Sequence, residues 1–164
     1  MKIRPAVKDD LEQLIQLRLD YFQEAEIYSP KGNGEPGFSP PIPAIGRSVL
    51  KEYFTQCLGR SLFAFLAELD GSVAGTAFLI IFDWPPSPAV PGGRMGRVAN
   101  VLTYPPYRRQ GVAGKLMLRL IEEARRLKVS RLDLLATASG EELYLKLGFT
   151  KPEGHINLQL PLDI

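Results

Sequence analysis

The chain has 164 residues, of which 45% are hydrophobic and 23% charged, and a formal net charge of +2 at pH 7. These values indicate one globular domain, exclude a disordered chain, and give no support to a nucleic-acid-binding surface. The single cysteine, Cys57, excludes an internal disulfide framework, and we find neither a signal peptide nor a membrane-spanning apolar stretch, so we expect a soluble cytoplasmic protein.

The first third of the chain predicts a strand, two helices and a long loop. Polar and apolar residues alternate over residues 2–6 well enough for a short edge strand. Over residues 8–22 the apolar side chains have the spacing of a helix. Residues 25–45 are rich in proline and glycine and cannot hold a regular element. Residues 47–59 resume helical spacing and end at a glycine.

The middle of the chain predicts strands. Residues 61–83 carry two apolar runs on either side of Asp70-Gly71, a dipeptide typical of a two-residue hairpin turn. Because these runs alternate little, we expect both faces of the sheet to be covered. A second proline-rich loop over residues 84–96 precedes a short strand over residues 97–104.

The last third predicts a strongly amphipathic helix over residues 112–129, a strand over 130–137, a short helix over 140–148 and a final strand over 155–160. A strand on either side of the long helix implies two parallel strands joined by a right-handed crossover. The pattern therefore predicts a single α/β or α+β domain.

The junction before the long helix is basic and rich in glycine. Gly111 and Gly114 stand where the helix begins, and the first N–H groups of a helix have no partner within it. With the helix dipole and the donors of Arg108 and Arg109, they predict a phosphate or pyrophosphate site. Alternatively, the glycines only permit a tight turn and the arginines are solvated. The spacing fits neither the triphosphate-binding loop nor the dinucleotide-binding fingerprint.

Residues 100–117, NVLTYPPYRRQGVAGKLM, resemble the acetyl-CoA-binding segment of the GCN5-related N-acetyltransferase (GNAT) family. In that family, Pro-x-x-Arg/Gln-x-x-Gly-x-Gly/Ala leads from a strand into a long helix. Arg108, Gly111 and Ala113 occupy the Arg/Gln, Gly and Gly/Ala positions of the pattern.

Two further segments extend the resemblance over nearly the whole chain. The family's closing segment has a tyrosine a few residues before Gly-Phe, which here are Tyr144, Gly148 and Phe149. Residues 3–18 are similar to the family's first strand and helix. The resemblance implies one GNAT-like domain over residues 1–164. Its fold is a mixed, mostly antiparallel sheet flanked by helices, with a central parallel strand pair that is splayed apart.

The resemblance also implies acetyl-CoA (coenzyme A) as the cofactor. Main-chain groups of Val101, Leu102 and Thr103 are then expected to pair with the pantetheine arm. The N–H group of Val101 or Leu102 would stabilise the negative charge developing on the thioester carbonyl oxygen. The residues expected to bind the pyrophosphate and neighbouring groups share the start of the helix: Arg108, Arg109, Gln110, Gly111, Val112, Ala113, Gly114 and Lys115.

Tyr144 matches the family residue that acts as general acid toward the departing thiolate, and a phenol is chemically suited to that role. The alternative is an aromatic side chain packed on the buried face of a short helix. Thr137 stands where many relatives carry asparagine. Thr137 and Ser139 either bond the pantetheine amides or only cap the helix near Gly140.

The function expected from the resemblance is transfer of an acetyl group to a primary amine of a small molecule or peptide by direct attack. The alternative is a non-catalytic acyl-CoA-binding or sensor module on the same fold. We expect no metal, nucleic-acid or membrane partner, and the family makes a homodimer possible.

The general base is not evident from the sequence. Glu68, Asp83 and Glu26 are candidates by placement, whereas the strand before the glycine-rich junction offers only Asn100. We expect the lone histidine, His155, to have a structural or surface role.

The acceptor side is expected to involve the irregular segment over residues 25–45, with Tyr28 and Phe38 shaping a cleft. Disorder of that segment is the competing interpretation. Trp84 or Arg94 from the second proline-rich loop is a candidate for the same cleft.

Overall fold

The computed structural model describes residues 1–24 and 46–152, so the predicted loop over residues 25–45 and the predicted strand over residues 155–160 lie outside it. The elements, in chain order, are β1 (Lys2–Pro5), the 3-10 helix η1 (Lys8–Asp10), α1 (Leu11–Glu24), α2 (Arg47–Cys57), β2 (Leu62–Leu69), β3 (Ser72–Asp83), β4 (Arg94–Thr103), the 3-10 helix η4 (Pro105–Tyr107), α3 (Val112–Arg126), β5 (Arg131–Asp133) and α4 (Glu141–Lys146). None of the helices in these two ranges is both long and apolar enough to cross a membrane.

The five strands form one sheet in the order β1-β2-β3-β4-β5. The first three pairings are antiparallel, and the pairing of β4 with β5 is parallel. The predicted hairpin is confirmed: β2 and β3 meet at Asp70 and Gly71, whose φ angles of 52° and 79° lie in the left-handed region. The predicted parallel pair is confirmed as well, with α3 as its crossover helix.

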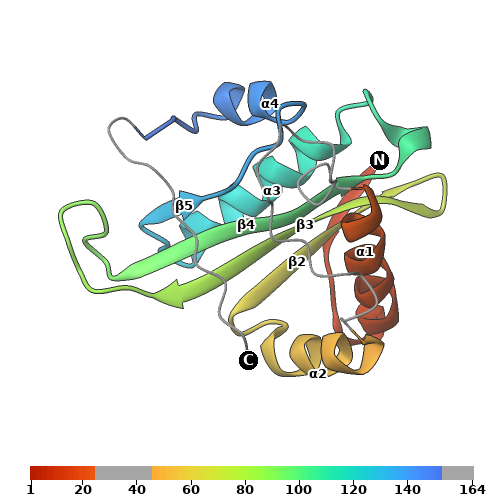
Figure 1. Ribbon diagram of the computed structural model, residues 1–164, viewed down its shortest axis with the longest axis horizontal. Helices are drawn as coiled ribbons and strands as arrows, with labels where there is room; N and C mark the ends of the chain where they lie inside the picture. The colour runs from red at the N-terminus through yellow and green to blue at the C-terminus, as the bar shows by residue number, and fades with distance from the viewer. Residues whose placement is uncertain (25–45, 153–164) are drawn as a thin grey trace, which may run out of the picture.

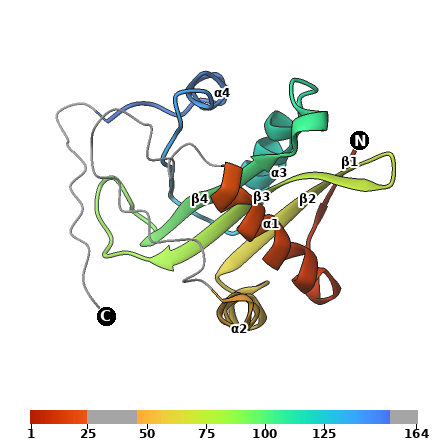
Figure 2. The same cartoon turned by 45° about the vertical axis from the view of Figure 1, so that its right-hand side comes forward.

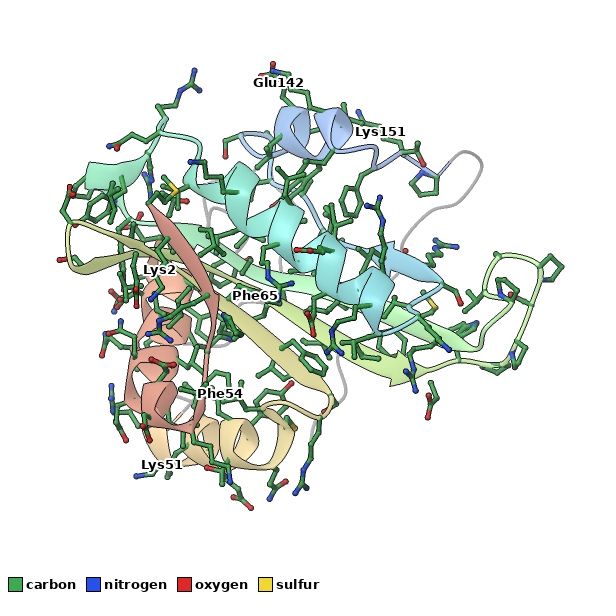
Figure 3. All side chains as sticks on the ribbon, turned by 180° about the vertical axis from the view of Figure 1, so that it is seen from behind. Lys2, Lys51, Phe54, Phe65, Glu142 and Lys151 are labelled. Atoms are coloured by element: carbon green, nitrogen blue, oxygen red, sulfur yellow. The ribbon has the colours of Figure 1, made fainter. Side chains whose placement is uncertain are left out.

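Helices cover both faces of this sheet. Phe65 and Ala67 of β2 pack with α3 on one face, while Ala64 and Leu66 pack with α1 and α2 on the other. Figure 2 shows α1 crossing in front of the strands, and Figure 3, from behind, shows α3 lying over the sheet beside Phe65. The prediction of a sheet covered on both faces is therefore confirmed, and it explains why the strand sequences alternate so little.

The parallel pair is short. β4 and β5 are in register only from Met95 to Arg97, opposite Arg131 to Asp133. Beyond Asp133 the chain leaves the sheet and runs to α4 (Figure 1). The predicted strand over residues 130–137 is thus too long, because its second half forms the connection to α4. β4 in turn starts at Arg94, within the predicted loop.

We predict that α3 contributes to stability through its buried face alone. Leu120 is fully buried, whereas Leu118 on the same helix is 59% exposed. Leu120→Ala should lower the free energy of unfolding by about 2–5 kcal/mol, because it leaves a cavity in the core. The matched control Leu118→Ala should change it by less than about 0.5 kcal/mol in urea unfolding. Equal losses in the two variants would contradict the packing of α3 described above.

Candidate functional site

A cavity of about 580 Å³ lies where β4 and β5 separate. Its described walls come from the end of α1, the second half of β4, the start of α3, the connection from β5 and α4. The residues predicted from the sequence that line it are Val101, Leu102, Thr103, Arg108, Arg109, Gly111, Val112, Ala113, Gly114, Thr137, Ser139 and Tyr144. Gln110 and Lys115 are not among the lining residues, and Gln110 Nε2 instead donates to the carbonyl oxygen of Pro106 at 3.0 Å.

The start of α3 opens into this cavity. Gly111 is the N-cap residue, with a left-handed φ of 77°, and no side chain of residues 1–24 or 46–152 caps the helix. A Cβ atom placed on Gly111 would meet no atom of another described residue, its two chain neighbours aside, within 4 Å. The first N–H groups of α3 therefore face space that a ligand can fill, at the positive end of the helix dipole. This arrangement fits the diphosphate of a nucleotide-type cofactor.

The second wall is an open strand edge. Because β5 pairs with β4 only as far as Arg97, residues 98–103 have no strand partner on that side in the described part of the chain. An extended ligand that carries amide groups can bind such an edge as an added strand does. The hydroxyl oxygen of Thr103 is buried without a hydrogen-bond partner among the described residues.

Arg108 is held by protein groups at the rim. Its Nη2 donates to Glu24 Oε2 at the end of α1, and its Nε donates to the carbonyl oxygen of Thr103 at 3.1 Å. The side chain thus links α1 to the end of β4. The structure places Arg108 in the cavity wall, as predicted, but with a carboxylate partner that the sequence did not reveal. Glu24 is the one carboxylate among the described residues that line the cavity.

Tyr144 reaches the cavity from α4. Its ring packs edge-on against Phe149, with the centroids 6.0 Å apart. Burial raises the pKa of Tyr144 to about 12, and the nearby Tyr21 of α1 adds to the shift. The phenol therefore keeps its proton at neutral pH and can act as a donor.

Thr137 and Ser139 form the turn that leads into α4. The Thr137 hydroxyl accepts a hydrogen bond from the N–H group of Gly140 at 3.2 Å and lies 3.1 Å from the Ser139 hydroxyl. Thr137 thus bonds the backbone of the turn that precedes α4, whereas Ser139 bonds no backbone N–H group and α4 itself has no side-chain cap among the described residues. Both residues line the cavity.

Two of the candidate bases lie away from the cavity. Glu68 accepts a hydrogen bond from Arg4 Nε at 2.6 Å, where β1 pairs with β2. Asp83 pairs with Arg94 at the start of β4, whereas the cavity begins beyond Arg97. The register of the sheet therefore excludes both from the site. Glu26 lies outside the described residues, as does His155.

Trp84 and Arg94 do not reach this cavity either. Trp84 follows β3 directly and is half exposed, with its ring against Phe82. Arg94 Nη1 donates to the carbonyl oxygen of Leu127 at 2.9 Å, at the C-terminal end of α3. Both residues lie at the end of the sheet opposite to this cavity, where β3 ends and β4 begins. The acceptor cleft for which they are candidates involves residues 25–45, outside the described residues, so their contribution to it stays a prediction. Tyr28 and Phe38 lie outside the described residues.

The sequence analysis missed several lining residues. Tyr21 and Glu24 come from the last turn of α1, and Leu134, Leu135 and Leu143 come from the connection to α4 and from α4 itself. No local motif marks these positions. Their place in the cavity depends on how α1 and α4 pack across β4.

The chain from residue 13 to residue 149 matches the family model described as the acetyltransferase (GNAT) family. A crystal structure of a predicted acetyltransferase with acetyl-CoA from Clostridium acetobutylicum is similar, with 26% identity, 96% and 95% of the two chains covered and a TM-score of 0.78. A GCN5-related N-acetyltransferase from Ralstonia eutropha JMP134 shows 25% identity, 97% coverage of both chains and a TM-score of 0.76.

Glucosamine-6-phosphate N-acetyltransferase from Arabidopsis thaliana shares the fold at 16% identity, with 99% and 98% coverage and a TM-score of 0.68. Among curated proteins, none matches the sequence. The family model spans most of the chain, including the open strand edge, the start of α3 and Tyr144. The protein therefore belongs to the GNAT family of acetyltransferases.

Proposed function

We propose that this protein is an acetyl-CoA-dependent N-acetyltransferase that acts on a primary amine of a small molecule or peptide by direct attack. One observation carries the proposal: the open start of α3, the unpaired edge of β4 and the Tyr144 phenol all line the same cavity. The similar structure from Clostridium acetobutylicum, which is described with acetyl-CoA, supports this choice of cofactor.

Acetyl-CoA supplies an acetyl group activated as a thioester. The N–H groups at the start of α3, between Arg109 and Gly114, bind the diphosphate. The edge of β4 orients the pantetheine arm through main-chain hydrogen bonds. The N–H group of Val101 or Leu102 donates to the thioester carbonyl oxygen, where negative charge grows as the amine attacks.

Tyr144 completes the set as the proton donor. Its raised pKa, about 12, keeps the phenol protonated when the substrates bind. It donates its proton to the departing sulfur and then takes up the proton that the attacking amine loses, so the number of protons is conserved. A free thiol, with a pKa of about 8.5, is a stronger acid than this phenol, so the transfer to sulfur is completed only because the proton lost by the amine restores the phenol.

The alternative is an acyl-CoA-binding or sensor module that does not catalyse. Such a module needs the start of α3 and the edge of β4 to bind the cofactor, but it does not need a protonated phenol near the thioester end of the pantetheine arm. Tyr144 in the cavity wall therefore favours the enzyme.

The two functions separate in one experiment. Isothermal titration calorimetry should show acetyl-CoA binding that weakens with salt, since phosphate contacts are ionic. The same protein, incubated with acetyl-CoA and a panel of amines, should release free thiol with at least one of them. Binding without thiol release across the panel would favour the sensor, and absence of binding would exclude both.

The glycine at the start of α3 offers a sharper test of the cofactor site. Gly111→Trp should weaken acetyl-CoA binding more than about tenfold, because the indole fills the space in front of the helix amides. Gly59→Trp is the matched control: Gly59 has a φ of 76°, an added Cβ there meets no atom within 4 Å, and the residue does not line this cavity. Similar losses of affinity in both variants would contradict the assignment.

The role of Tyr144 predicts a split between turnover and binding. Tyr144→Phe should lower kcat about tenfold or more while it leaves the affinity for acetyl-CoA within about twofold, because only the proton donor is removed. Tyr107→Phe serves as the control, since Tyr107 lies in η4 and does not line the cavity. An unchanged kcat in Tyr144→Phe would reduce Tyr144 to a packing role.

A further inference from the structure

We propose that Asn100 and Arg18 are positioning residues that hold a bulge in β4 and thereby aim the N–H group of Val101 at the thioester carbonyl oxygen. This inference rests on the proposed function, because it concerns the orientation of the acetyl group of bound acetyl-CoA.

The bulge is visible in the register of β3 and β4. Thr76 lies opposite Leu102 and Phe78 lies opposite Ala99, so Ala77 alone faces both Asn100 and Val101. β4 thus carries one residue more than β3, which bends β4 and changes the face of the sheet to which its following side chains point.

The packing on the two faces of the sheet confirms the shift. Ala99 and Leu102 pack with the core under α1 and α2, whereas Val98 and Val101 pack with the core under α3. A regular strand would put residues 98 and 101 on opposite faces. The extra residue therefore fixes which way Val101 points, and a slip of the bulge would reverse it.

The backbone of Asn100 needs support to keep this geometry. Its φ of 51° lies in the left-handed region, which costs roughly 1–2 kcal/mol for a residue with a side chain, although asparagine tolerates it better than most. Asn100 is also 1% exposed, so its amide needs partners inside the protein.

α1 supplies both partners. Arg18 Nη1 donates to Asn100 Oδ1 at 3.1 Å, and Asn100 Nδ2 donates to the carbonyl oxygen of Leu17 at 3.4 Å. The Arg18 guanidinium lies over the ring of Phe22, 4.1 Å from its centroid, and 5.6 Å from that of Tyr21. Two aromatic faces thus fix the arginine, which in turn fixes the asparagine. Figure 2 shows α1 lying across one face of the sheet.

The chain offers a matched comparison. Tyr104 donates through its hydroxyl to Asp20 Oδ2 at 2.5 Å, which is a second link between α1 and the end of β4. This link lies past the bulge, and neither residue lines the cavity. Its loss removes a similar contact between the same elements without touching the Asn100 amide.

The experiment measures the carbonyl carbon of bound acetyl-CoA directly. Acetyl-CoA labelled with carbon-13 at the carbonyl is added to wild type and to the variants Asn100→Gly, Arg18→Met and Tyr104→Phe, and its NMR resonance is compared with that of the free cofactor. Glycine at position 100 keeps the left-handed backbone accessible and removes both hydrogen bonds. Calorimetry with coenzyme A, which has no acetyl group, reports on the rest of the site.

In wild type, the hydrogen bond should displace the carbonyl resonance downfield. Asn100→Gly and Arg18→Met should each lose more than half of this displacement, Tyr104→Phe should keep it, and all three should bind coenzyme A within about threefold of wild type. Full displacement of the resonance in both Asn100→Gly and Arg18→Met, or an equal loss of displacement in Tyr104→Phe, would overturn the inference. A loss of coenzyme A binding in Asn100→Gly or Arg18→Met would overturn it as well. Failure of wild type to bind acetyl-CoA would instead overturn the proposed function on which the inference rests.

Discussion

The early separation of β4 from β5 is the constraint on which the rest of this structure depends. Three residue pairs hold the two strands together, and beyond Arg97 the edge of β4 has no strand partner among the described residues. Backbone donors and acceptors that lose water must be paired, so such an edge is suited to a ligand that carries its own amides. The same separation sends the chain from Asp133 to α4, so that Tyr144 of α4 lines the same cavity as the open edge.

α1 holds β4 and the turn after it through a series of polar contacts along the helix. The pairs, from the bulge to the start of the glycine-rich turn, are Arg18 with Asn100, Asp20 with Tyr104 and Glu24 with Arg108. Burial and the hydrogen bond to Asp20 both raise the pKa of Tyr104 above its ordinary value, so this link stays protonated at physiological pH. The second half of β4 and the turn after it are thereby fixed to one rigid element.

The anion site at the start of α3 is built mainly from backbone groups. A helix N-terminus acts through its amide dipoles and adds nothing to the formal charge of the chain. Glycine contributes by leaving space, since Gly111 has no side chain to fill the entrance. A net charge of +2 is therefore compatible with a phosphate site, although it gave no support to a nucleic-acid surface.

Local pattern was enough for the helices, for the hairpin at Asp70-Gly71 and for the open start of α3, because periodicity and turn chemistry act over a few residues. The resemblance to the GNAT family singled out the motif residues from Val101 to Gly114 and Tyr144, most of which line the cavity. Tertiary structure alone decided where β5 leaves β4, that Asp83 lies at the wrong end of the sheet, and that α1 partners Asn100 and Arg108. Those contacts join residues more than 80 positions apart, and such pairings depend on how helices pack across strands, which no short stretch of sequence encodes.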